Sequence, residues 1–152
     1  MQLKKIIEFI VFSNVWISLG AIGIALSTYF YNESEVDLLM IMLVFFSTLF
    51  GYSLQNISQR EIYNHRSNQI LWSQSNNKLI KGIVFVSFLI SVFLTFYIMN
   101  VYLIILSIPF FGLVFFYRNA FSNKLQLRNI PFFKILIISF CWSWTCCALP
   151  QL

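Results

Sequence analysis

The chain has 152 residues, of which 59% are hydrophobic, 19% are aromatic and only 10% are charged. An average soluble domain has roughly 25% charged residues, so this composition argues against a water-soluble globular domain. The net charge of +5 is divided among short segments between apolar runs and forms no continuous basic face, so we expect no nucleic-acid partner.

Five apolar segments are long enough to cross a bilayer. They cover residues 6–30, 36–54, 79–99, 101–117 and 130–149. Backbone amides in lipid find no water to bond, so each crossing segment should be helical. The sequence therefore predicts an all-α fold, in which residues 1–152 form one domain: a polytopic transmembrane helix bundle with five spans.

The first segment, residues 6–30, is too long for the apolar core of a signal peptide and lacks a small-residue cleavage site, so we expect a retained span. It carries Asn14, Ser18, Ala21 and Ala25 at spacings that place them on one helix face. Helices in lipid associate through small and weakly polar residues, so this face should pack against other spans. Asn14 is also the best candidate for lining a polar cavity, because a buried amide needs partners.

The second segment runs into a polar stretch, residues 52–63, with the sequence YSLQNISQREIY. If the helix continues through this stretch, one face carries Tyr52, Gln55, Asn56, Gln59 and Tyr63. Such a face can line a pocket at the membrane surface or simply meet water. The only acid of the stretch, Glu61, lies off this face, and divalent cations need carboxylates, so we expect no magnesium site here.

The third and fourth segments are joined at Met99–Asn100, a connection so short that we expect an antiparallel helical hairpin. Pro109 and Gly112 predict a kink in the fourth segment. Two further stripes of small residues suggest helices packed around a shared interior, or a polar-lined cavity. The stripes are Ser87, Ser91 and Thr95 in the third segment, and Ser139, Ser143 and Cys146 in the fifth.

The three cysteines, Cys141, Cys146 and Cys147, lie in one apolar run without CxxC spacing, and the single histidine, His65, lies in a polar loop. We therefore expect neither a metal site nor a disulfide framework.

The basic residues are confined to alternate connections of the predicted bundle. All ten lie before the first span, between or beside the second and third, or between or beside the fourth and fifth. Glu33, Glu35 and Asp37 cluster instead in and beside the first opposite turn. The positive-inside rule then predicts a multi-pass membrane protein with a cytoplasmic N-terminus.

Three stretches resemble the UbiA family of membrane prenyltransferases, and more specifically its short-loop, Bacteroidetes-type members. They are NVWISLGAIGIAL (14–26), FFSTLFGYSLQ (45–55) and LRNIPFFKILIISFCWSW (127–144). The last is the most specific, because Arg128 and Pro131 match the basic residue and proline with which the family begins its fifth helix. The resemblance implies the N-terminal half of such a bundle, in a bacterial inner membrane.

Members of this family transfer a prenyl group from a prenyl diphosphate to a lipophilic acceptor, and Asp-rich motifs hold Mg²⁺ against the diphosphate. Residues 52–63, where the first motif would fall, contain no Asp, and the sequence ends at CCALPQL before a second could occur. We therefore expect a partial or degenerate member that is inactive alone, without catalytic residues, metal ligands or cofactor. The resemblance implies membrane lipids and prenyl diphosphate as partners. The candidate substrate-binding residues are Asn14, Tyr52, Gln55, Asn56, Arg60, Lys124 and Arg128.

Two other functions remain open at this point. A non-enzymatic small membrane protein that packs with a partner or with itself would explain the small-residue stripes and the missing carboxylates. A transporter fragment would predict an internal repeat or paired broken helices, and the sequence shows only one Pro-interrupted segment, so this function ranks last.

Overall fold

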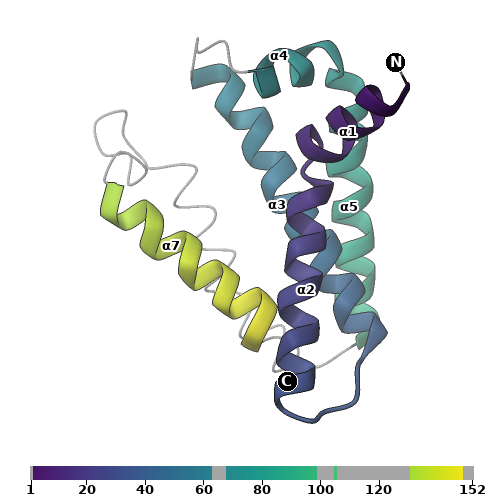
Figure 1. Ribbon diagram of the computed structural model, residues 1–152, viewed down its shortest axis with the longest axis vertical. Helices are drawn as coiled ribbons and strands as arrows, with labels where there is room; N and C mark the ends of the chain where they lie inside the picture. The colour runs from purple at the N-terminus through teal and green to yellow at the C-terminus, as the bar shows by residue number, and fades with distance from the viewer. Residues whose placement is uncertain (1, 63–67, 99–104, 106–130, 149–152) are drawn as a thin grey trace.

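The computed structural model describes residues 2–62, 68–98, 105 and 131–148, and within them every element is helical (Figure 1). The elements are α1 (Gln2–Phe12), α2 (Val15–Tyr31), α3 (Leu38–Ile62), α4 (Asn68–Ser75), α5 (Asn77–Ile98), α7 (Pro131–Ser143) and a π-helical turn, η2 (Trp144–Ala148). The predicted all-α class is confirmed. Of the predicted segment 101–117 only residue 105 is described, and the predicted kink and the tight turn before the segment lie outside the described residues.

The first apolar segment is not one continuous helix, as predicted, but two helices bent by 64° between Phe12 and Val15. Asn14 has a φ of 67°, in the left-handed region, which ends the right-handed ladder of α1. Serine and asparagine compete with helical hydrogen bonds through their short polar side chains, and asparagine tolerates this conformation better than most residues. The pair Ser13–Asn14 therefore permits the break.

The turn from α2 to α3 is closed by backbone hydrogen bonds. Glu33, with a φ of 51°, donates its N–H to the carbonyl of Phe30, and Ser34 donates to Tyr29, which is the pattern of a Schellman motif. Asp37 then begins α3 by accepting a hydrogen bond from the N–H of Leu39 at 2.8 Å. The acidic residues of this turn thus stand at the tip of a helical hairpin.

Helix α3 is central among the described helices, with α2 and α5 against it (Figure 1). Met40 and Leu43 of α3 pack on Leu94 of α5. On the other side, Val44 meets a seam of small residues, and every member of that cluster is at most 1% exposed. The cluster comprises Ala21, Ala25, Val44 and Cys146.

The predicted packing face of the first segment is confirmed, because Asn14, Ser18, Ala21 and Ala25 are all buried. In the predicted stripe of the third segment, Ser87 is buried. Its hydroxyl donates to the carbonyl of Ile83, one turn earlier in the same helix. Hydroxyls that bond their own helix favour the packing interpretation of these stripes over a polar-lined cavity.

The predicted stripe of the fifth segment is confirmed at Cys146, which is buried, but it is wrong at Ser139 and Ser143, which are exposed. Trp142 and Cys146, which also share a helix face at a spacing of four, turn toward α2 and α3 instead. The larger Trp142 ring both fills more space and finds a hydrogen-bond acceptor in the bundle, so its face is the one that is buried.

The outward face of the bundle is strongly apolar. Helix α5 is long and apolar enough to cross a membrane, yet only 17% of its most apolar stretch is buried inside the molecule. Phe85, Phe93 and Phe96 are each more than 60% exposed. The bent pair α1–α2 passes the same test only when both helices are taken as one span. An exposed apolar surface of this extent indicates that something other than water contacts it.

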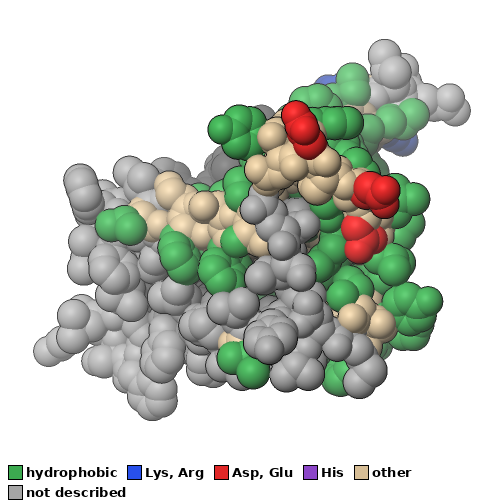
Figure 2. Space-filling model, turned by 90° about the horizontal axis from the view of Figure 1, so that it is seen from below, with side chains coloured by type: hydrophobic (Ala, Val, Ile, Leu, Met, Phe, Trp, Pro, Cys, Tyr) green, Lys and Arg blue, Asp and Glu red, His purple; other side chains and the backbone are tan. Residues whose placement is uncertain are grey.

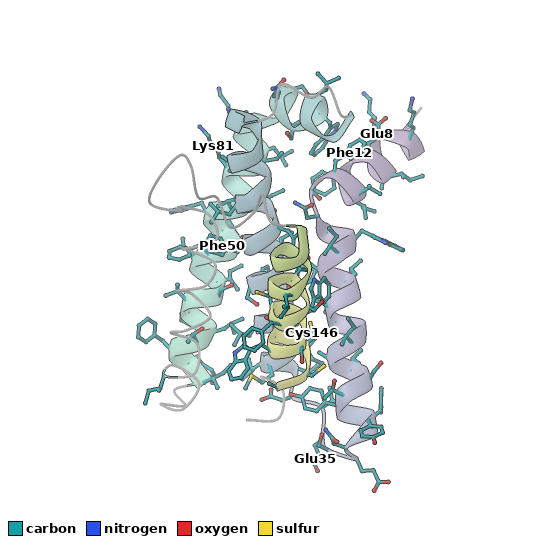
Figure 3. The ribbon with its side chains drawn as sticks, turned by 90° about the vertical axis from the view of Figure 1, so that its left-hand side faces the viewer. Glu8, Phe12, Glu35, Phe50, Lys81 and Cys146 are labelled. Carbon is teal, nitrogen blue, oxygen red and sulfur yellow. The ribbon has the colours of Figure 1, made fainter. Side chains whose placement is uncertain are left out.

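The two ends of the bundle carry opposite charges. Lys81 lies at the end formed by α1, α4 and the start of α5, whereas Glu35 lies at the far end (Figure 3). Lys4 and Lys5 belong to α1, at the same end as Lys81. Seen from that far end, acidic side chains gather around the α2–α3 turn (Figure 2).

Candidate functional site

Polar groups from three parts of the chain meet at one turn of α3. The residues of this turn are Tyr52 and Ser53, and they contact the α1–α2 break on one side and α7 on the other. We call the set Ser13, Asn14, Tyr52, Ser53 and Trp142 the polar junction.

The break side of the junction is deeply buried. Ser13, Asn14 and Ser53 are each at most 2% exposed. The hydroxyl of Ser53 donates to the backbone carbonyl of Ser13 at 3.4 Å, a contact between residues 40 positions apart. A bent helix leaves backbone groups without their usual partners, and in an apolar environment such groups must be satisfied from elsewhere. Ser53 performs this role across the helix interface.

Ser18 of α2 also bonds the backbone beside the break. Ser18 donates both its N–H and its hydroxyl to the carbonyl of Asn14, each at 3.1 Å. Among the described residues, the hydroxyl of Ser13 has no hydrogen-bond partner. A buried hydroxyl without a partner is unfavourable. It can donate a hydrogen bond to a small polar group that reaches the break, or accept one from it.

The α7 side of the junction is a single strong contact. The indole N–H of Trp142 donates to the hydroxyl oxygen of Tyr52 at 2.7 Å. The rings lie 6.2 Å apart between centroids. Because Tyr52 accepts in this bond, its own O–H remains a donor that can point to another oxygen. The contact also fixes the orientation of the phenol ring.

Two of the seven candidate residues have described side chains, and both belong to the polar junction. Asn14 lies at the break and Tyr52 faces α7. Helix α3 does continue through the polar stretch to Ile62, so it carries Gln55, Asn56 and Arg60 beyond Tyr52, but their side chains lie outside the described residues. Lys124 and Arg128 also lie outside them.

Sequence reasoning did not predict a binding role for Ser13, Ser53 or Trp142. For Ser13 a signal was present, since Ser-Asn interrupts an otherwise apolar run and both residues weaken helices. For Trp142 no local signal exists, because only the packing of α7 against α3 brings it to Tyr52.

The junction offers hydroxyl, amide and indole groups, which hydrogen-bond a polar ligand but do not neutralise a metal ion. Within the part of the chain that is described, no three His, Cys, Asp or Glu residues come together as metal ligands would. Comparisons of the chain with protein-family models, with curated proteins and with solved structures find no match.

Proposed function

We propose that the chain is a polytopic membrane protein whose spans are α2, α3, α5 and α7 with η2, together with the segment 101–117, and whose N-terminus is cytoplasmic. The exposed phenylalanines of α5 support a lipid environment, because a water-exposed face of this kind would be unfavourable. The separation of Lys4, Lys5 and Lys81 from the acidic turn supports the orientation.

Cysteine labelling in intact cells tests this orientation. In a background with the three native cysteines replaced by serine, we expect a membrane-impermeant maleimide to label Glu35→Cys from outside. Lys78→Cys is the matched control: it is exposed at the opposite end, and it should react only after the cells are opened. External labelling of the Lys78→Cys variant alone would invert the proposed map, and external labelling of both would contradict a membrane-spanning bundle.

We further propose that this bundle has the scaffold of the N-terminal half of a UbiA-type prenyltransferase and that its polar junction binds a prenyl diphosphate weakly, without metal and without transferring the prenyl group. One observation carries this proposal. Asn14 and Tyr52, singled out independently along the chain, belong to elements that meet at one turn of α3. The exposed apolar side chains of α7, Leu136 and Phe140, suit a prenyl chain, and the hydroxyl and amide groups of the junction suit phosphate oxygens.

A binding assay with farnesyl diphosphate, with and without Mg²⁺, tests the ligand class. We expect weak binding that is unchanged by Mg²⁺, because the described junction lacks carboxylates. Tyr52→Phe should weaken it by a factor of about five, which corresponds to the loss of one hydrogen bond. Tyr97→Phe is the matched control, since that side chain is 66% exposed on α5.

Tight binding that requires Mg²⁺ would show that carboxylates act from outside the described residues, contrary to the proposal. Equal loss of binding in the Tyr52→Phe and Tyr97→Phe variants would remove the junction as the site.

A second function, that of a non-enzymatic membrane protein that packs with itself or a partner, is favoured by the outward position of Ser139 and Ser143. Small hydroxyl residues four positions apart on an apolar helix suit close contact with another helix. Absence of farnesyl diphosphate binding, together with a dimer-sized band in blue-native electrophoresis, would favour this function over the first.

A further inference from the structure

Helix α1 separates its charged and apolar side chains more strongly than the other described helices do. At 100° per residue, Lys4, Lys5 and Glu8 fall within one sector of about 100°, which also contains Phe12. Outside this sector every residue except Gln2 is apolar, and three of these apolar residues are about half exposed. These are Ile6, Ile7 and Val11. A helix with this division of side chains has a face for water and a face for hydrocarbon.

The direction of α1 differs from that of a membrane span. It is bent by 64° from α2, so its 11 residues rise by only about 7 Å along the axis of α2, given 1.5 Å per residue. A continuous helix of the same length would rise by about 16 Å. If α2 crosses the bilayer, α1 therefore stays near one level of it.

Helix α4 holds α1 in this direction. Phe9 and Phe12 pack against the ring of Trp72 in α4, with ring centroids 6.4 and 5.8 Å apart. Both helices lie across the same end of the bundle (Figure 1). Because the aromatic contacts use one side of α1, the arc with Ile6 and Ile7 remains uncovered by the described residues.

The charges at this end have mostly one sign. The Lys4 side chain is 83% exposed, and Lys5, Lys78 and Lys81 are also exposed. The acid in α1, Glu8, lies 3.9 Å from Lys4, at the limit of an ion pair, and such exposed pairs contribute little. The exposed lysines therefore create a positive potential where lipid head groups would lie.

We propose that α1 is not the start of the first span but an amphipathic helix that lies in the cytoplasmic surface of the membrane, with Lys4 and Lys5 bound to anionic phospholipid head groups. Ile6 and Ile7 enter the boundary between head groups and acyl chains, and Val11 lies at the edge of the charged sector. The apolar arc determines how deeply the helix enters the membrane, and the lysines determine its preference for anionic lipid. This inference rests on the membrane location proposed above.

Spin labels along α1 of the full chain test the inference. Single cysteines replace Lys5, Ile6, Ile7, Glu8 and Val11 in turn, in a cysteine-free background reconstituted into nanodiscs of equimolar phosphatidylcholine and phosphatidylglycerol. We expect collisions with oxygen, which dissolves in lipid, to be several-fold more frequent at Ile6 and Ile7 than at Lys5 and Glu8, with Val11 between the two groups. Collisions with a water-soluble nickel chelate should show the reverse pattern.

Two results would overturn the inference. A steady increase of depth from Lys5 to Val11, without helical periodicity, would mean that α1 continues the span. Nickel accessibility at every position would place α1 in water. A label at Phe93, 66% exposed on α5, separates these failures from failure of the membrane location, because that label must be accessible to oxygen if the bundle is in the membrane at all.

A second experiment tests the binding of Lys4 and Lys5 to lipid head groups, with the double variant Lys4→Gln/Lys5→Gln. In phosphatidylcholine with phosphatidylglycerol, we expect this double variant to lower the oxygen accessibility of a label at Ile7, whereas in phosphatidylcholine alone the variant and its parent should agree. Lys78→Gln/Lys81→Gln is the matched control, since it removes the same charge from the same end without changing α1. Equal effects in both lipids, or equal effects of both double variants, would contradict a role for Lys4 and Lys5.

Discussion

Replacing Ala25 by leucine is expected to lower the free energy of unfolding by about 2 kcal/mol, the typical result of forcing extra methylenes into a filled core. Ala25 is fully buried between α3 and η2, where Val44 and Cys146 already occupy the space. The added atoms would push η2 away and disturb the contact of Thr28 with the carbonyl of Cys146, now 3.5 Å. Titration of the detergent-solubilised chain with SDS, followed by circular dichroism, measures the change.

The matched control is Gly23→Leu, two residues earlier in the same helix. A side chain added at Gly23 meets open space, so the substitution adds apolar volume on the outward face without touching the seam. It should leave stability unchanged or raise it slightly, because leucine favours helix more than glycine does. Equal destabilisation by the two leucines would show that the small-residue seam is not the basis of packing.

Replacing Asn14 by valine is expected to destabilise the chain by about 2 kcal/mol, because a β-branched residue is strained in the left-handed region. Asn14 has a φ of 67° and is 2% exposed, so the protein cannot relax at this position without moving α1. The same SDS titration measures the loss. A second effect should accompany it: the bend between α1 and α2 should decrease, which the distance between spin labels at Lys5 and Ser27 would report.

Asn14→Gly separates the backbone role from the side-chain role. Glycine adopts the left-handed conformation freely but supplies no amide, so we expect a smaller loss, about 1 kcal/mol. If the glycine variant were as unstable as the valine variant, the amide rather than the backbone conformation would determine stability here. If both were as stable as the parent, the break would depend on contacts elsewhere.

The sequence predicted those features that depend on composition and on helical spacing. The all-α class follows from apolar run length, and the burial of Ser18, Ala21 and Ala25 was predicted from the spacing of small residues along one helix face. The same reasoning failed for Ser139 and Ser143, because spacing defines a face without saying which face is buried. That choice depends on the partner of Trp142, which lies 90 residues away along the chain.

The break at Asn14 could not be derived from run length, since Ser13 and Asn14 interrupt the apolar pattern for only two residues. Helices in lipid commonly contain such residues without bending. What fixes the bend is tertiary: Ser53 satisfies the carbonyl of Ser13, and Trp72 packs on α1. The candidate site was therefore only partly predictable, because its members come together through the same contacts.

The opposite charges at the two ends of the bundle have an electrical consequence. Under the proposed orientation, the lysines of α1 and α5 face a cytoplasm that is negative in an energised cell, and Glu33, Glu35 and Asp37 face the positive side. Each charge is worth about 2.3 kcal/mol per 100 mV, so turning the described charges over would cost on the order of ten kcal/mol. The membrane potential would thus favour the proposed orientation of a newly inserted molecule, and dissipating the potential with an ionophore would remove this preference.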